Sequence, residues 1–171
     1  MPKRRDPFKI PTFVKAASHV LSVEGGLSDH PKDPGGATNL GISKKANPDI
    51  NVSKLDQKKA LDLYESRYWN KIRGEELPPK EAVAIFDNAV HAGPARAIKN
   101  VQGILGLPEK GVMDDTTLQE IHNFTAREGS DSLLQSLEEK RRSRLLRLKA
   151  YKHFGKGWEA RLHKLRENLE N

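Results

Sequence analysis

One carboxyl group of this sequence lies at the end of an apolar helical pattern, a position suited to acid–base chemistry. Phe13, Ala17 and Val20 recur at helical spacing, and Glu24 continues the same face four residues after Val20. A Gly-Gly pair then ends the predicted helix. Apolar surroundings and the negative end of a helix dipole both raise the pKa of a carboxyl group. Glu24 is therefore a candidate general acid, since such a group must stay protonated near neutral pH.

A long glycine-rich loop follows this glutamate directly. Residues 25–41 have the sequence GGLSDHPKDPGGATNLG, which includes a dense Asp-Pro-Gly-Gly turn. Loops of this length inside a compact domain often carry function. An exposed glutamate capped by two glycines is the alternative interpretation of Glu24, and the loop that follows favours the catalytic one.

These motifs resemble those of a known family. Glu-Gly-Gly is followed by Asp-Pro-Gly-Gly-x-Thr-x-x-Gly-Ile, then by YESRYW at 64–69 and VAIFDNAVHAG at 83–93. The pattern is similar to that of the glycoside hydrolase family 108 lysozymes, which include phage endolysins and bacterial N-acetylmuramidases, and the resemblance spans most of the chain. It implies a lysozyme-like fold and hydrolysis of the β-1,4 bond between N-acetylmuramic acid and N-acetylglucosamine, with Glu24 as the catalytic acid.

Glycoside hydrolysis usually needs a second carboxyl function. Asp33, nine residues after Glu24, is the preferred candidate, and Asp29 is its competitor because the loop conformation is not fixed by the sequence. A plain Asp-Pro turn residue is the alternative for Asp33. Thr38 is a candidate to hold the attacking water or a sugar, with turn chemistry as its alternative. Asn39 is a candidate substrate contact.

Aromatic residues at helical spacing suggest a surface for sugar rings. Tyr68, Trp69 and Arg67 are the candidates for contacting the glycan, whereas core packing is preferred for Tyr64.

Two polar residues on a later helix, Asp87 and His91, lie one helical turn apart and are further substrate-binding candidates. A helix pair whose hydrogen bonds are satisfied within the protein is the alternative. The family typically has Asn at the position of His91, so a substrate hydrogen bond from His91 would depend on pH.

The sequence predicts a mainly α fold of lysozyme-like α+β type, a compact helical bundle with a loop-rich active-site lobe. A short β-hairpin is expected around Asn39 to Ile42, a capping box at Ser53–Asp56 opens the second helix, and Gly155-Lys-Gly157 is expected to break the C-terminal helices. The predicted helices are 12–24, 53–69, 79–92, 94–105, 114–121, 132–153 and 158 onward. We expect one domain, 1–171, with a catalytic segment at 12–93. The helical segment at 94–166 corresponds to the family's predicted peptidoglycan-binding region, but it lacks a Gly-Pro of that pattern, which favours a role in the core.

The net charge of the chain is +7, and the excess lies near its end. From residue 138 onward there are eleven basic and five acidic residues. Basic helices over Lys140–Arg166 suggest contact with lipopolysaccharide or an anionic membrane, with a solvated helix face as the alternative. No specific nucleic-acid motif is present. The sequence has no cysteine, which excludes disulfides and thiol catalysis, and the scattered histidines predict neither a metal site nor a cofactor.

The basic N-terminal residues lack a following apolar segment of the signal-peptide type. We therefore expect a monomeric protein made in the cytoplasm that acts on peptidoglycan in the host cell wall after release by another agent. Two rival functions stay open at this point. One is a lytic transglycosylase, and the other is a non-catalytic basic protein that binds the envelope or nucleic acid.

Overall fold

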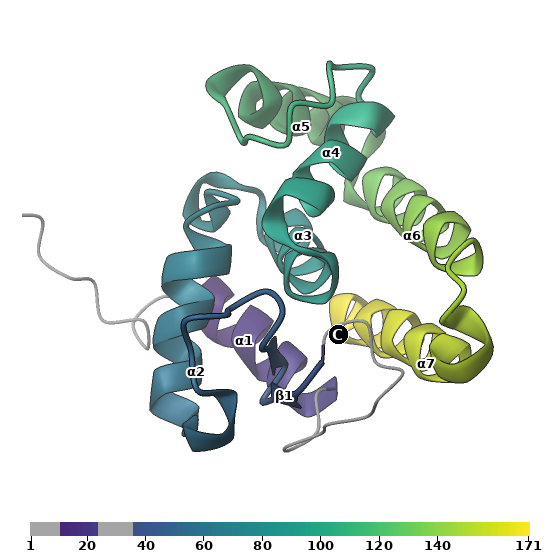
Figure 1. The fold of residues 1–171 in the computed structure, drawn as a ribbon. Coiled ribbons are helices and arrows are strands. Elements are labelled where there is room, and N and C mark those ends of the chain that lie inside the picture. The colour runs from purple at the N-terminus through teal and green to yellow at the C-terminus, as the bar shows by residue number, and fades with distance from the viewer. Residues whose placement is uncertain (1–10, 24–35) are drawn as a thin grey trace, which may run out of the picture.

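The computed structural model describes residues 11–23 and 36–171, with the side chain of Pro11 left out. Within these ranges the protein is mainly α-helical and its β-structure is limited to one hairpin, as predicted (Figure 1). The α-helices are α1 Pro11–Val23, α2 Gln57–Tyr64, α3 Pro79–Ala92, α4 Pro94–Ile104, α5 Asp115–Glu128, α6 Ser130–Leu146 and α7 Tyr151–Glu170. The shorter elements are the 3-10 helices η2 Val52–Lys54 and η4 Gly74–Glu76, the π-helix η3 Glu65–Trp69, and the strands β1 Thr38–Asn39 and β2 Ile42–Ser43.

Helix α3 is the centre of the fold. It starts with Pro79 at its first position, where the fixed φ of proline suits a helix and no hydrogen-bond donor is lost. Every side chain from Glu81 to Ala89 is buried, so the helix has no solvent-facing side over this stretch. Helices α1, α4, α6 and α7 all pack against it, and Figure 1 shows it in the middle of the molecule.

An aromatic cluster joins the N-terminal half of the chain to α3. The ring of Trp69 lies 5.3 Å from that of Phe13 in α1 and 5.6 Å from that of Phe86 in α3. Tyr64 contacts Phe86 from the other side, with the ring centroids 5.8 Å apart. A Cβ at Gly74 would lie 2.4 Å from the Trp69 ring, so glycine is required there.

The predicted hairpin is confirmed. Strands β1 and β2 are antiparallel, with Asn39 opposite Ile42. The two residues between them, Leu40 and Gly41, have φ values of 50° and 78°, as a type I′ turn requires. Leucine rarely adopts positive φ, and here the hydroxyl of Tyr64 donates to its carbonyl oxygen, which fixes the turn onto the α2 region.

The predicted capping box at Ser53–Asp56 is wrong. The N-cap of α2 is Asp56 itself, whose carboxylate accepts from the amide of Lys59 at 2.8 Å. Ser53 lies one turn earlier, in η2, and its hydroxyl donates to Asn51. Aspartate is as good an N-cap as serine, and Asp56, the last residue of the predicted capping box, is the N-cap in the structure.

The predicted break at Gly155-Lys-Gly157 is also wrong. Helix α6 ends at Leu146, and α7 runs from Tyr151 to Glu170 through both glycines. A Cβ at Gly155 would lie 2.8 Å from the Tyr151 ring, so this glycine permits close packing within the helix. No helix among the described residues is long and apolar enough to cross a lipid bilayer.

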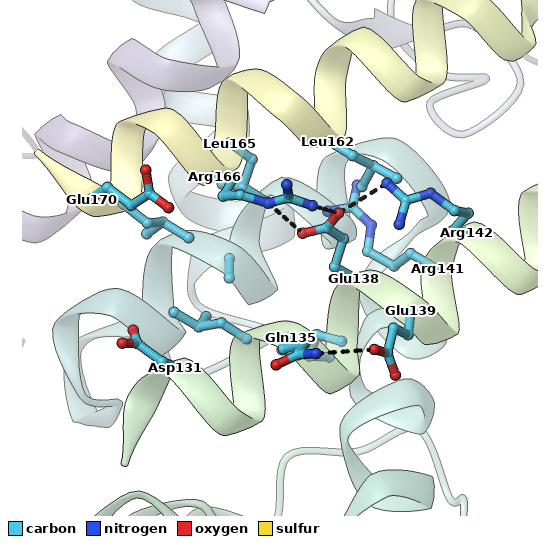
Figure 2. A pocket seen from close by; sticks show the side chains of 14 residues that line it. Asp131, Gln135, Glu138, Glu139, Arg141, Arg142, Leu162, Leu165, Arg166 and Glu170 are labelled. Atoms are coloured by element: carbon cyan, nitrogen blue, oxygen red, sulfur yellow. Dashed lines mark hydrogen bonds and ion pairs between the residues drawn. The ribbon is translucent and has the colours of Figure 1, made fainter.

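Helices α6 and α7 border a groove with a volume of about 470 Å³ (Figure 2). Its floor is apolar and includes Leu137 and Leu165. Its rim holds an ion-pair bridge between the two helices, because Glu138 accepts from Arg142 at 2.9 Å and from Arg166 at 3.1 Å. Of the predicted site residues that the structure describes, none lines this groove.

Candidate active site

Helix α1 ends at Val23, the residue directly before the predicted acid. Glu24 and the candidate second carboxylates, Asp33 and Asp29, lie outside the described residues. The described part of the candidate site consists of the hairpin, the loop at 44–50, the π-helix η3 and the polar side chains of α3.

The two hairpin candidates differ in their surroundings. Thr38 is half-buried, and its hydroxyl donates to the carbonyl oxygen of Gly36 at 3.2 Å. Asn39 is 9% exposed, and its side-chain amide donates to the carbonyl oxygen of Val52 at 2.9 Å. The amide of Asn39 therefore attaches the hairpin to η2, whereas the contact of the Thr38 hydroxyl with Gly36 lies within the turn.

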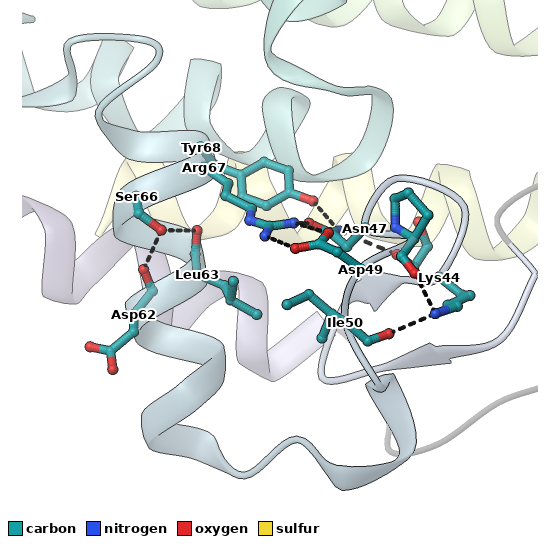
Figure 3. Close-up of polar contacts among 11 residues, drawn as sticks. Lys44, Asn47, Asp49, Ile50, Asp62, Leu63, Ser66, Arg67 and Tyr68 are labelled. Carbon is teal, nitrogen blue, oxygen red and sulfur yellow. Dashed lines mark hydrogen bonds and ion pairs between the residues drawn. The ribbon is translucent and has the colours of Figure 1, made fainter.

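Arg67 is the most accessible of the candidates in η3, and it holds the 44–50 loop (Figure 3). One guanidinium nitrogen donates to Asn47 Oδ1 at 2.8 Å and to Asp49 Oδ1 at 2.9 Å, and the other contacts the second oxygen of Asp49. The hydrogen bond from Arg67 lowers the pKa of Asp49 to about 2. Lys44 closes the loop on itself through the carbonyl oxygen of Pro48 at 2.6 Å.

The loop residues Asn47 and Asp49 were not identified from the sequence. They lie about twenty residues before their partners on η3, and no local pattern marks them. Arg67 remains 35% exposed despite these contacts, so its guanidinium can still meet a ligand from solvent. A π-helix such as η3 is a frequent feature of functional sites.

The aromatic candidates lie mostly in the core. Trp69 is 1% exposed and Tyr68 is 5% exposed, so neither ring presents a face on which a sugar could stack. The hydroxyl of Tyr68 accepts from Asn47 at 3.1 Å, which adds to the attachment of the loop. Tyr64 is fully buried, as its preferred interpretation predicted.

Asp87 is fully buried at the meeting point of four helices. Its Oδ1 lies 3.1 Å from His19 Nε2 in α1 and accepts from Arg161 Nε in α7 at 3.0 Å. Its Oδ2 lies 2.8 Å from Arg141 Nη1 in α6. Burial alone would raise the pKa of Asp87, but the two arginines and the contact with His19 hold it well below its ordinary range.

His91 joins the same cluster through Arg141 and makes no hydrogen bond with Asp87. Arg141 donates to His91 Nδ1 at 3.3 Å, which places the imidazole proton on Nε2. Burial and the charges of Arg161 and Arg141 lower the pKa of His91 to about 3. The ring is therefore neutral near pH 7 and packs 6.0 Å from the ring of Trp158.

The partners of Asp87 were missed, although the sequence held a signal for two of them. Arg141 lies four residues from both Leu137 and Leu145, on the apolar face of its helix. Arg161 similarly lies four residues before the buried Leu165. An arginine on a buried face requires an acidic partner in the core, and Asp87 is that partner.

The family model described as glycosyl hydrolase 108 matches residues 17–93, from α1 through α3. The solved structure of Brucella abortus SagA is 39% identical and has a TM-score of 0.83, covering 93% of this chain and 94% of that one. The chain belongs to glycosyl hydrolase family 108. The resemblance seen in the sequence is thereby confirmed, and the protein is a glycoside hydrolase. A comparison with curated proteins finds no match.

In this family 108 protein, the matched region contains every site residue predicted from the sequence, from Glu24 to His91. The arginines that hold Asp87 come from α6 and α7, beyond that region. Similarity to SagA over most of the chain shows that these later helices belong to the shared fold. Among the residues that the structure describes, no group of three or more His, Cys, Asp or Glu side chains is arranged to hold a metal ion.

Proposed function

We propose that this glycoside hydrolase is a lysozyme that cleaves the β-1,4 bond between N-acetylmuramic acid and N-acetylglucosamine in bacterial peptidoglycan. The observation that carries the proposal is the family 108 match over residues 17–93, because this region holds the predicted acid Glu24 and its glycine-rich loop. An endolysin role, in which the enzyme reaches the wall from the cytoplasm and lyses the host cell, is part of the same proposal.

Glu24 is assigned the role of general acid. It follows directly on Val23, the last residue of α1, where the helix dipole is negative. A negative helix end disfavours a second negative charge, so it raises the pKa of a nearby carboxyl group. Glu24 protonates the glycosidic oxygen as the bond to the leaving sugar breaks.

A second carboxylate is assigned the activation of water. Asp33 is the preferred residue and Asp29 the alternative, and Thr38 positions the attacking water. Abstraction of the water proton by the carboxylate lets the oxygen attack the anomeric carbon, which yields a free reducing end.

Arg67 is assigned to substrate binding, together with Asn39. Its side chain is 35% exposed and fixed by Asp49 and Asn47, which supports a role in orienting a polar ligand. A guanidinium held in one position loses little conformational freedom when it binds the sugar.

Clearing of permeabilised Gram-negative cell walls tests the proposal. Wild type is compared with Glu24→Gln and with Glu139→Gln, the same substitution at an exposed position. General acid catalysis contributes about 10²–10⁴-fold to rate, so we expect a loss of that order for Glu24→Gln only. Equal clearing by all three proteins would reject Glu24 as the acid.

The products decide the reaction type. Hydrolysis leaves reducing N-acetylmuramic acid ends, whereas a lytic transglycosylase leaves 1,6-anhydro ends. Mass spectrometry of the released fragments distinguishes the two, and anhydro ends would replace the lysozyme proposal by the transglycosylase one. A wild-type protein that binds walls without releasing fragments would support the non-catalytic alternative.

A further inference from the structure

One stretch of the chain combines a high density of cations with an absence of acids. Residues 140–158 include eight Lys or Arg residues and no Asp or Glu. Three of the eight are neutralised within the fold, because Arg141 pairs with Asp87, Arg142 with Glu138 and Glu159, and Lys140 with Glu109. The other five form no ion pair with a described residue, and they are Arg144, Arg147, Lys149, Lys152 and Lys156.

These five cations surround the turn that joins α6 to α7, and we name residues 144–158 the α6–α7 corner. All of them except the half-buried Arg144 are exposed. A further cation from another helix, Arg96 in α4, acts on Arg144. Burial and that like charge both lower the pKa of Arg144. Among the described residues, no acid pairs with any of these five cations, so positive charge is concentrated at the corner.

Apolar side chains are interleaved with these cations. Leu146, the last residue of α6, is 54% exposed. Tyr151, Phe154 and Trp158 on α7 are half-buried, and Trp158 lies 6.1 Å from each of the other two rings. Leucine and aromatic side chains beside cations are typical of a protein surface that enters the interface of a membrane.

The shape of the corner favours a flat partner. In Figure 1 the turn between α6 and α7 lies at the right-hand edge of the molecule, with the two helices running back from it. A nucleic acid would use the positive charge but would gain nothing from the exposed leucine. An anionic bilayer would use both, because its headgroups attract the cations and its acyl boundary accepts the apolar side chains.

We propose that the α6–α7 corner is a docking surface for an anionic phospholipid bilayer. The cations Arg147, Lys149 and Lys152 contact lipid phosphates, and Leu146 inserts at the level of the headgroups. The proposal depends on the charges and apolar side chains of the corner alone, so its test does not require the proposed lysozyme activity.

Flotation with vesicles tests this assignment. Vesicles of phosphatidylcholine mixed with phosphatidylglycerol are compared with vesicles of phosphatidylcholine alone. We expect wild type to bind the first and not the second, and to lose binding as salt increases. Absence of binding to the anionic vesicles, or equal binding to both kinds, would overturn the proposal.

Two variants separate the corner from the overall charge of the protein. Reversal at the corner, Arg147→Glu with Lys149→Glu and Lys152→Glu, should weaken binding by at least roughly a hundredfold, since each cation near an anionic membrane contributes about fivefold and each new glutamate is also repelled. The control reverses Lys54, Lys58 and Lys71, which are equally exposed cations elsewhere on the surface. It changes the net charge equally and should retain most of the binding. Equal losses in the two variants would overturn the proposal.

Leu146→Ser tests the apolar contribution. Removing one inserted leucine should weaken vesicle binding about tenfold and leave binding to a short DNA duplex unchanged. Unchanged vesicle binding by Leu146→Ser, together with tighter binding of wild type to the duplex than to the vesicles, would assign the corner to nucleic acid instead. Circular dichroism spectra of all variants should match that of wild type, because the substituted positions are exposed.

Discussion

Arg161 Nε lies 3.0 Å from Asp87 Oδ1, and this contact joins the last helix of the protein to the central one. The same carboxylate also meets His19 of α1 and Arg141 of α6. One buried acid thus connects helices that are far apart in the sequence. His19 lies 68 residues from Asp87, and Arg161 lies 74 residues from it. Through Asp87, the C-terminal helices are therefore linked to His19, which precedes Glu24 by five residues in the sequence.

Replacing this acid should be strongly destabilising. Asp87→Asn removes the negative charge and leaves two buried guanidinium groups uncompensated. Breaking a buried ion pair in this way costs about 3–5 kcal/mol, which urea denaturation would measure. The control is Asp49→Asn, because an exposed ion pair such as that of Asp49 with Arg67 contributes far less to stability than a buried one. A loss below that of the control would show that the cluster does not hold the helices together.

Protonation of His91 should make the fold sensitive to mild acid. Burial and the two arginines lower the pKa of His91 to about 3 in the folded state, from an ordinary value of 6.5. At pH values between these two, the unfolded chain binds a proton at His91 that the folded protein does not bind. The contribution of the neutral His91 to the free energy of unfolding is therefore complete above the unfolded pKa and is lost as the pH falls below it.

The matched measurement compares unfolding free energies at pH 7 and pH 4. His91→Asn keeps an acceptor for Arg141 but cannot titrate. From pH 7 to pH 4, its free energy of unfolding should therefore fall by about 2–4 kcal/mol less than that of wild type. His163→Asn, at an exposed histidine, should follow the wild-type curve. Identical pH dependence in wild type and His91→Asn would contradict the prediction.

Alanine substitution at the two glycines of α7 should change the stability of the protein in opposite directions. At Gly157 a Cβ would meet nothing within 4 Å, so alanine should stabilise the helix by about 0.5–1 kcal/mol. At Gly155 a Cβ would lie 2.8 Å from the Tyr151 ring, and alanine should destabilise by about 1–3 kcal/mol. Thermal unfolding of the two variants measures the difference, and stabilisation by both would show that the ring moves aside freely.

Arg67 should matter more for activity than for folding. If its guanidinium orients the glycan, Arg67→Ala loses a charged hydrogen bond of about 1.5–3 kcal/mol, which corresponds to a rate of wall clearing reduced by roughly tenfold to a hundredfold. Asp49→Asn disturbs the same loop without removing the guanidinium and should cost much less. Equal losses in the two variants would mean that Arg67 only holds the 44–50 loop.

The local helices and the family were predictable from the sequence. The apolar spacing before Glu24 marked α1, Asp114 marked the start of α5, and Pro79 marked the start of α3. These features were predictable because helix periodicity and capping depend on a few neighbouring residues. The Glu-Gly-Gly and Asp-Pro-Gly-Gly motifs were sufficient for the family, which the comparisons confirm.

Which polar residues contact one another was not predictable from the sequence and follows from the tertiary structure. Asp87 looked like a ligand-binding residue until its buried partners from three other helices were in place. Trp69 looked like a sugar platform, and Gly155 like a helix break, until their neighbours filled the space around them. The physical reason is the same in each case. Burial and charge compensation depend on residues that the fold brings together from distant positions in the sequence. A local sequence pattern does not show which distant residues will become neighbours.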